Sequence, residues 1–374
     1  MDVHFFYIWF LIILVSHFII LFSYAHFSTK EDILNNILGF GALFIVFIHI
    51  PMFLLLMFQD VDLHKFILPL FLDSVLIPLL LIGFTTLLFT IVLLIFRPIL
   101  KSKDYSGMKQ KISVKLQSMS KTRKDLFRKI WHILIFIGLF VIWYLSYNFV
   151  QTEMMGNKKK PKIEPEITNM LYLYLRILTK PNSIKNVLFS LQWFYYVLFF
   201  FFYIFSLIML VNEFTRKTKN LGFPLNFIPL LLLTDEEKEK YGTYLYFAIG
   251  NMFAAFICPP MAFFAILAMS SIGDLVPSQV GIRYGKSHIP WNKKKTFEGT
   301  IAGALASFFF CLFFVGFIYA LIFATAFMCI DLFTRKPINI SDNLLIPIGC
   351  GLIFIFFRFY FDFDYNPIIL ELFF

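Results

Sequence analysis

The residues best suited to chemistry lie between 270 and 300, where a short polar segment joins two apolar stretches. Spacings of four, three and four place the following residues on one face of a helix: Asp274, Ser278, Gly281 and Gly285. An unpaired carboxylate beside the membrane costs a few kcal/mol, so Asp274 is expected to meet a cation, a metal or water. The two glycines would let a bulky ligand approach closely, and the alternative is that they pack against another helix.

A run of cations follows directly, at the loop that opens the next apolar helix. It comprises Lys293, Lys294 and Lys295, followed by Thr296, Glu298 and Gly299. Lysines at a helix N-terminus, with its free N–H groups and positive dipole end, suit a polyphosphate. The nearby carboxylate suggests a metal between the phosphates or a hydrogen bond to a ribose. The alternative is a membrane anchor on the cytosolic side, but the proximity of Asp274 favours the phosphate site.

Further polar clusters stand at the ends of other apolar stretches. They are Arg128, Lys129 and His132; Glu213 and Arg216; Asp331; and Asp342 with Asn343. Each cluster has a simpler explanation, namely cations that reach for the membrane surface, an ion pair on a helix surface, or helix capping. All of them can lie on one side of the membrane, which favours a shared site.

The composition defines the class of protein. The 374 residues are 59% hydrophobic, 20% aromatic and only 15% charged, and the mean hydropathy is +0.78. Too few polar side chains remain to cover a soluble domain, and apolar runs of about 20 residues exclude an outer-membrane barrel. We therefore predict an all-α, multi-pass transmembrane helical bundle with about 9–10 spans. The net charge of +10 is assigned to cytosolic loops and not to nucleic-acid binding.

Apolar stretches bounded by charge predict where the spans lie. They are 5–27, 33–58, 66–96, 130–150, 187–211, 243–258, 260–283, 300–332 and 343–360. The strongly basic loop 97–129 is expected in the cytosol, with 212–242 and 284–299 on the same side. Three parts are predicted: N-terminal membrane helices in 1–100, a basic cytosolic loop in 101–129, and a catalytic membrane domain in 130–374.

Two smaller expectations concern the first span and the cysteines. The first span has neither a basic start nor a small-residue cleavage site, so it is expected to be retained and not removed as a signal peptide. Four cysteines stand singly in apolar surroundings and are expected to be buried small hydrophobic residues, neither disulfides nor metal ligands. They are Cys258, Cys311, Cys329 and Cys350.

Four blocks of sequence, taken in order, resemble dolichol kinase, and the resemblance covers about residues 125–350. The blocks are Arg128-Lys129-Ile130-Trp131-His132; Gly273-Asp274 with Ser278 and Gly281; Lys294-Lys295-Thr296-Phe297-Glu298-Gly299-Thr300; and Asp342-Asn343-Leu344-Leu345-Ile346-Pro347. That family comprises multi-pass, CTP-dependent lipid kinases related to phytol kinases and yeast-type diacylglycerol kinases. The glutamate in the third block points to the polyprenol branch. The same block is also similar to phosphatidate cytidylyltransferase.

The resemblance implies a reaction in which CTP and a dolichol-type polyprenol give CDP and the polyprenyl monophosphate at the cytosolic face. The membrane would be that of the endoplasmic reticulum in a eukaryote and the cell membrane in an archaeon. Lys294, Lys295 and the turn 296–299 would bind the CTP phosphates. Asp274 or Asp342 would hold Mg²⁺, and the other would orient the lipid alcohol. The remaining candidate residues of the nucleotide site are Arg128, Lys129, His132, Ser278, Gly281, Gly285, Lys286, Lys293, Thr300 and Asn343.

The chain departs from the family pattern at Leu275 and Pro277, and Asp331 stands where the family has glutamate. Pro277 is expected to kink the helix just beyond Asp274. Two other functions stay open: a cytidylyltransferase, and a transporter or non-catalytic scaffold.

The long stretch 300–332 can cross the membrane an odd or an even number of times, and this decides on which side its end lies. If that stretch crossed the membrane once, Asp331 and Asp342 would face the side opposite Asp274 and Lys295, and one site could not contain them all. We therefore predict that 300–332 is a hairpin that turns near Gly316.

Overall fold

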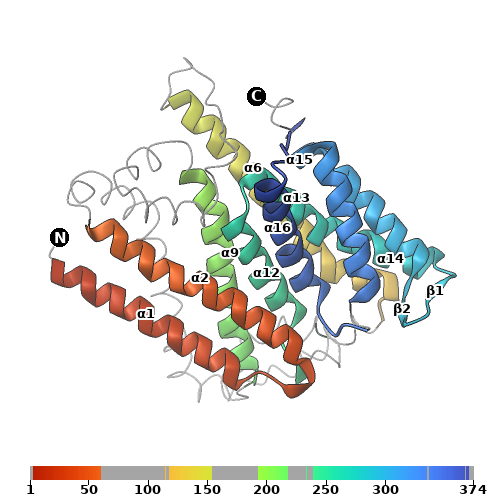
Figure 1. Ribbon diagram of the computed structural model, residues 1–374. Helices are drawn as coiled ribbons and strands as arrows, with labels where there is room; N and C mark the ends of the chain where they lie inside the picture. The colour runs from red at the N-terminus through yellow and green to blue at the C-terminus, as the bar shows by residue number, and fades with distance from the viewer. Residues whose placement is uncertain are drawn as a thin grey trace. The chain divides into compact units, whose positions relative to one another are not determined.

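The computed structural model describes residues 3–59, 118–153, 193–217, 239–334 and 337–366, together with Val114, Leu233 and residues 368–369. Almost all of these residues lie in helices (Figure 1). Five of the helices are long and apolar enough to cross a membrane: Lys30–Ile50, Asp125–Leu145, Pro260–Tyr284, Phe297–Phe333 and Asp342–Tyr360. The chain is thus an all-α membrane bundle, as its composition predicts. The expected span 66–96 and most of the basic loop 97–129 lie outside the described residues, and the end of that loop, from residue 121, is helical.

The chain forms two compact units, and the first contains residues 1–117, 173–190 and 200–249. Its helices are α1 (Val3–His26), α2 (Ile33–Gln59), most of α9 (Trp193–Lys217) and the start of α12 (Thr243–Ile257), with a short 3-10 turn η1 (Lys30–Asp32) between the first two. The His17 ring stacks on Phe47 at 4.2 Å and hydrogen-bonds the hydroxyl of Tyr203. This polar contact between α1 and α9 gives the apolar helices a fixed register.

The second unit contains residues 118–172, 191–199 and 250–374. It is built from α6 (Lys121–Glu153), α13 (Pro260–Ala268), α14 (Asp274–Tyr284), α15 (Phe297–Phe333) and α16 (Asp342–Tyr360). A π-turn, η5 (Met269–Gly273), joins α13 to α14. A two-stranded antiparallel hairpin of β1 (His288–Ile289) and β2 (Asn292–Thr296) precedes α15.

The sequence predicted a kink just after Asp274. The structure instead has its irregular turn just before Asp274. Helix α14 continues through Pro277 to Tyr284, whereas the π-turn ends at Gly273. The reason is that a proline ring removes an N–H and clashes with the carbonyl four residues earlier, which belongs to Gly273. Pro277 therefore disturbs the turn that leads into Asp274, and π-turns of this kind often occur at functional sites.

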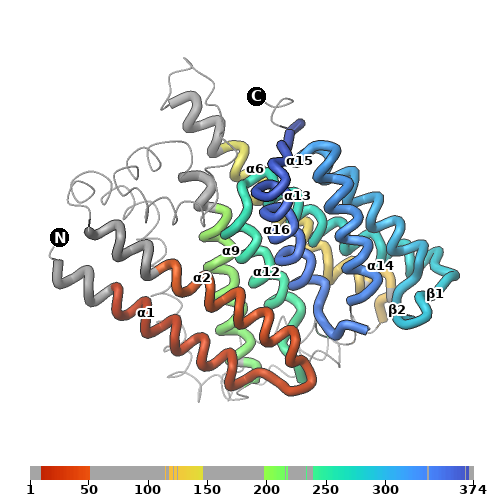
Figure 2. The backbone as a smooth tube through the Cα atoms, viewed as in Figure 1, coloured from red at the N-terminus to blue at the C-terminus, as the bar shows by residue number. Residues whose placement is uncertain are grey.

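Helix α15 is a hairpin of two antiparallel arms, 297–315 and 317–333, as parity predicted. Gly316 has φ 78° and ψ 179°, a backbone conformation that favours glycine. The two ends meet, because the Thr300 hydroxyl donates a hydrogen bond of 2.5 Å to Asp331. The arms contain about 19 and 17 residues, or roughly 28 and 26 Å at 1.5 Å per residue. They lie side by side in Figures 1 and 2.

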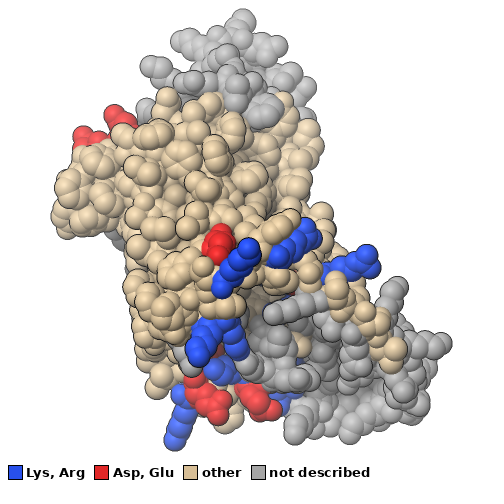
Figure 3. All heavy atoms as spheres, turned by 90° about the vertical axis from the view of Figure 1, so that its right-hand side faces the viewer, with Lys and Arg blue, Asp and Glu red and all other residues tan. Residues whose placement is uncertain are grey.

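Charge is distributed unevenly on the face that carries α14, β1 and β2. Figure 3 shows charged side chains gathered in the lower half of this face, with an uncharged surface above them that reaches as far as acidic side chains at the upper left. Such an uncharged surface suits contact with lipid, and a charged border suits the head-group region. Several large apolar side chains of α15 are also exposed, among them Phe309 and Phe317.

We predict that Gly316→Ala destabilises the protein by about 1–3 kcal/mol, because a non-glycine residue is strained at this φ. A Cβ atom there would also lie 2.9 Å from the carbonyl oxygen of Asn366. Thermal unfolding of the detergent-solubilised protein measures the effect. Gly138→Ala is the matched control, since a Cβ at this helical glycine meets no atom within 4 Å. Equal unfolding temperatures of the two variants would contradict a strained turn.

The membrane position of the hairpin can be tested by cysteine labelling. Ser287→Cys and Asn339→Cys, both at exposed positions, should react with an impermeant maleimide from the same side of the membrane, because both ends of α15 meet. Cys258, Cys311 and Cys350 are buried as expected, but the expectation was wrong for Cys329, which is exposed. Cys329→Ser therefore provides a suitable background. Labelling from opposite sides would mean that α15 crosses the membrane once, which would contradict the hairpin.

Candidate functional site

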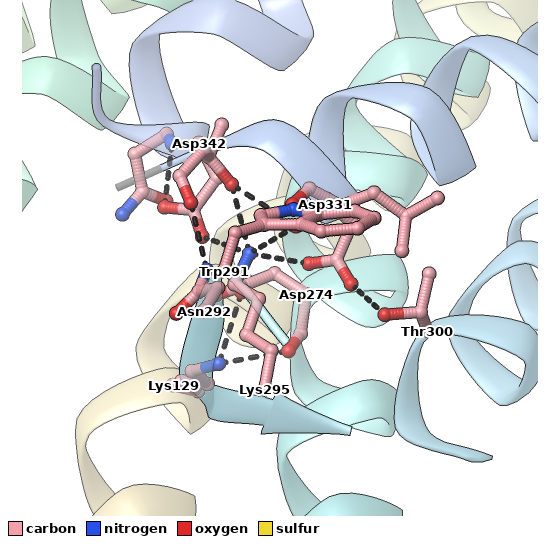
Figure 4. A network of polar contacts seen from close by, with 11 residues as sticks. Lys129, Asp274, Trp291, Asn292, Lys295, Thr300, Asp331 and Asp342 are labelled. Carbon is pink, nitrogen blue, oxygen red and sulfur yellow. Dashed lines mark hydrogen bonds and ion pairs between the residues drawn. The ribbon is translucent and has the colours of Figure 1, made fainter. Parts of the chain in front are cut away.

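The centre of the second unit's polar network is Lys295, which strand β2 carries into the protein (Figure 4). Its Nζ lies 2.6 Å from Asp331 Oδ1 and 3.5 Å from Asp342 Oδ2. It also donates to the Asp331 carbonyl at 3.0 Å and to the Thr334 hydroxyl at 2.8 Å. One ammonium group therefore connects strand β2, the end of α15 and the start of α16.

The acidic partners of Lys295 are themselves fixed. The other oxygen of Asp331 accepts from Thr300 at the start of α15. Asp342 is the first residue of α16, and its carboxylate accepts from the N–H of Asn343 at 3.1 Å. The amide of Asn292 donates to the carbonyl of Thr334 at 2.9 Å, which holds the chain just after α15 against β2.

Asp274 is paired with Lys129, which comes from a helix almost 150 residues earlier in the chain. The Lys129 Nζ lies 3.0 Å from Asp274 Oδ1 and donates to the Asp274 carbonyl at 2.7 Å. One turn away, Asp125 accepts hydrogen bonds from Ser278 at 2.6 Å and from Gln279 at 2.9 Å. These two adjacent contacts attach the start of α6 to α14 and place Lys129 beside Asp274.

The network is acidic overall, with three carboxylates and two ammonium groups. Burial alone would lower the pKa of Lys295, but Asp342, Asp331 and Asp274 outweigh it and raise this pKa above the ordinary value of 10.5. Lys295 is therefore protonated at neutral pH. Because its pKa is higher in the folded state, its contribution to stability is fully present below pH 10.5 and is lost only as the pH rises through the folded-state value.

Several predicted nucleotide-site residues have local structural roles. The Thr296 side chain caps α15 by accepting from the N–H of Gly299. The Glu298 carboxylate accepts from the N–H groups of Lys286 and Ser287, which closes the turn before β1. These contacts explain a threonine and a glutamate here without a ligand.

The small-residue face of α14 packs against the protein. A Cβ atom at Gly285 would lie 2.6 Å from Thr296 Cγ2, and one at Gly299 would lie 2.6 Å from the Pro277 carbonyl. A Cβ at Gly281 would also approach Thr296, at 3.0 Å. The alternative of glycine-mediated helix packing therefore accounts for Gly281 and Gly285.

The other candidate residues fall into two groups. Lys286, Lys293 and Lys294 are exposed, while Arg128 and His132 are half-buried on α6, beside Lys129. Glu213 and Arg216 belong to the first unit, where Glu213 Oε2 receives a 2.6 Å contact from Arg216 and the hydroxyl of Tyr244 donates to Glu213. They form the predicted ion pair within one helix, but it is buried and not on a helix surface.

Within the described part of the chain, no group of three or more His, Cys, Asp or Glu residues is placed to hold a metal ion by itself. Mg²⁺ is usually bound through one or two carboxylates together with substrate phosphates. Asp274 and Asp342 are carboxylates of the kind this ion prefers, and each already contacts a lysine ammonium group.

Sequence reasoning missed Asp125, Asn292 and Thr334. Asp125 was one acid in a basic loop, and the other two are ordinary polar residues with no motif around them. Only the folded chain shows that they hold Lys129 and Lys295 in place.

Comparisons of the chain with models of protein families, with curated proteins and with solved structures found no match.

We predict that Lys295→Met destabilises the protein by about 3–5 kcal/mol, since removal of one member of a buried ion pair leaves an uncompensated charge. Lys293→Met is the matched control, because Lys293 is an exposed lysine on the same strand. Thermal unfolding in detergent should show a fall of order 10 °C for the first variant and little change for the second. Similar unfolding temperatures of the two variants would mean that the ion pairs of Lys295 do not stabilise the fold.

Proposed function

We propose that this protein is a CTP-dependent kinase that phosphorylates the terminal hydroxyl of a dolichol-type polyprenol. The proposal rests on the resemblance of four sequence blocks to dolichol kinase. One observation carries it further: residues from all four blocks, Lys129, Asp274, Lys295 and Asp342, lie in one polar network of the second unit. A membrane scaffold has no need to bring charges from four distant segments together, because each buried charge costs free energy.

The chemistry of phosphoryl transfer suits such a network. The transferred phosphoryl group spreads negative charge over its oxygens, so catalysis depends on cations and on a positioned nucleophile. Lys293 and Lys294 are exposed residues next to Lys295 on β2 and would bind the nucleotide phosphates. Lys295 is already paired with Asp331 and Asp342. Its role would be to hold these acids in place.

The acids would divide two tasks between them. One of Asp274 and Asp342 would hold Mg²⁺, and the other would accept a hydrogen bond from the lipid hydroxyl and orient it. When bound, Mg²⁺ would neutralise charge on the phosphates. Lys129 fixes the side chain of Asp274 and limits repulsion between the two carboxylates. Arg128 and His132, one turn of α6 apart, would complete the phosphate site.

The protein is an integral membrane protein by its helices, and we propose that the site faces the cytosol, where CTP is available. The host membrane would be the endoplasmic reticulum in a eukaryote or the cell membrane in an archaeon. Phytol or diacylglycerol is the alternative lipid substrate within the same reaction.

A cytidylyltransferase is the second candidate, since the Lys294–Gly299 block is also similar to that class. The two reactions differ in the phosphorus atom that is attacked, and so in their products. Purified protein should therefore be incubated with labelled CTP or ATP and a set of lipid alcohols and lipid phosphates, since a phosphatidate cytidylyltransferase uses a lipid phosphate as the nucleophile. Release of CDP with a phosphorylated alcohol supports the kinase. Release of pyrophosphate supports the cytidylyltransferase, and no turnover with any lipid supports a transporter or scaffold.

We predict that Asp274→Asn lowers the rate of phosphoryl transfer by at least about 100-fold, because the amide keeps the volume but loses the charge. Asp362→Asn is the control, since Asp362 is an acid with a 96% exposed side chain near the C-terminus. Asp274→Asn removes one member of the ion pair with Lys129 and is expected to lower stability, so the activities should be compared after correction for the folded fraction measured by thermal unfolding. Full activity of Asp274→Asn would remove this carboxylate from the proposed mechanism.

A further inference from the structure

The β1–β2 hairpin is the only sheet in the described part of the chain, and its tip carries Trp291. Ile289 pairs with Asn292, so Pro290 and Trp291 form a two-residue turn. Hairpin tips in polar loops usually carry small or polar residues. A large aromatic side chain at this position calls for an explanation.

The indole of Trp291 is held rigidly on one side. Its Nε1–H donates to the Leu332 carbonyl at 2.9 Å, and its ring stacks on Phe333 with centroids 5.9 Å apart and planes within 8°. Trp291 and Phe333 nevertheless each stay 43% exposed. The structure therefore presents a fixed, flat aromatic surface whose orientation is set before any ligand arrives.

This surface adjoins the polar network and a set of exposed cations. Leu332, which accepts the indole hydrogen bond, directly follows Asp331, the partner of Lys295. Figure 4 draws Trp291 next to Asn292 and Lys295 in that network. On the same strand, Lys293 and Lys294 are exposed. An exposed aromatic face on the same hairpin as two exposed lysines is complementary to a ligand that joins a flat ring to phosphates.

We propose that Trp291, supported by Phe333, is the platform on which the base of the nucleotide donor stacks. This inference rests on the proposed kinase function and names the part of the protein that binds the nucleoside. Every nucleobase has a π-face, so stacking adds affinity for the nucleoside without by itself selecting the base. The phosphates of a base held on Trp291 would extend toward Lys293 and Lys294.

The competing occupant is lipid, since tryptophans are enriched where a membrane meets water. A tryptophan at the membrane surface commonly directs its indole N–H toward the lipid head groups. The indole N–H of Trp291 instead donates to the backbone carbonyl of Leu332. The hydrogen bond favours a face presented to a ligand over an anchor in the bilayer surface. The experiment below separates the two.

The test measures equilibrium binding of CTP and of inorganic tripolyphosphate to the full-length protein in detergent. Trp291→Leu should weaken CTP binding by about tenfold or more, as expected for the loss of one base–aromatic stack. Tripolyphosphate has no base, so its affinity should stay unchanged. Trp291→Phe keeps an aromatic face and should restore CTP binding to within about threefold of the parent. Tyr360→Leu is the matched control, because Tyr360 is an 80% exposed aromatic side chain at the opposite end of α16 from Asp342, and this variant should bind both ligands normally.

The outcomes distinguish this proposal from the proposed function. If the parent protein transfers phosphate from CTP but Trp291→Leu binds CTP normally, the stacking platform is wrong and the kinase stands. If Trp291→Leu weakens both ligands equally, the effect is on the fold or the lysines, and the platform is again wrong. If the parent protein neither binds CTP nor phosphorylates a lipid alcohol, both proposals fail.

Discussion

The ion pair between Lys295 and Asp331 is the contact on which the second unit depends. It closes the α15 hairpin at its open end, and Thr300 and Thr334 add hydrogen bonds to the same two side chains. Through Asp342, the same lysine reaches the first turn of α16. A buried pair of charges adds little net stability over an apolar pair, but it strongly penalises any arrangement in which the partners separate. The pair thus specifies how β2, α15 and α16 meet.

The contact of Lys129 with Asp274 is a second, partly buried lysine–acid pair. Here the ammonium contacts two groups of a single residue. The π-turn before Asp274 and the proline after it interrupt the regular hydrogen-bond pattern of the helix at this point. The ammonium of Lys129 bonds one carbonyl and the carboxylate of the same residue, Asp274. A local interruption of a membrane helix is thereby stabilised by a cation from another helix. Two lysines on separate elements, each matched to acids, give the unit its polar interior.

Composition and periodicity were enough to predict the class of fold, because the cost of exposing backbone to lipid leaves few alternatives. The count of membrane crossings, together with the resemblance that places Asp331 and Asp342 in one site with Asp274, predicted the turn at Gly316. What the sequence could not supply was the pairing of charges. Of three consecutive lysines only Lys295 turns inward, and spacing along a strand does not reveal where an acid 36 residues later will lie. In the same way, Thr296 and Glu298 matched a motif, yet their contacts are those of a helix cap and a closed turn.

The hairpin also constrains how the protein is made. Lys295 leaves the ribosome well before Asp331, so the first arm of α15 enters the membrane while its charged flank still lacks the acid that will neutralise it. The second arm must follow and fold back before the lysine is satisfied. The two arms of α15 are synthesised in succession, and in the folded protein the chain reverses direction between them at Gly316. The same residues that shape the mature network set the order in which it can assemble during synthesis.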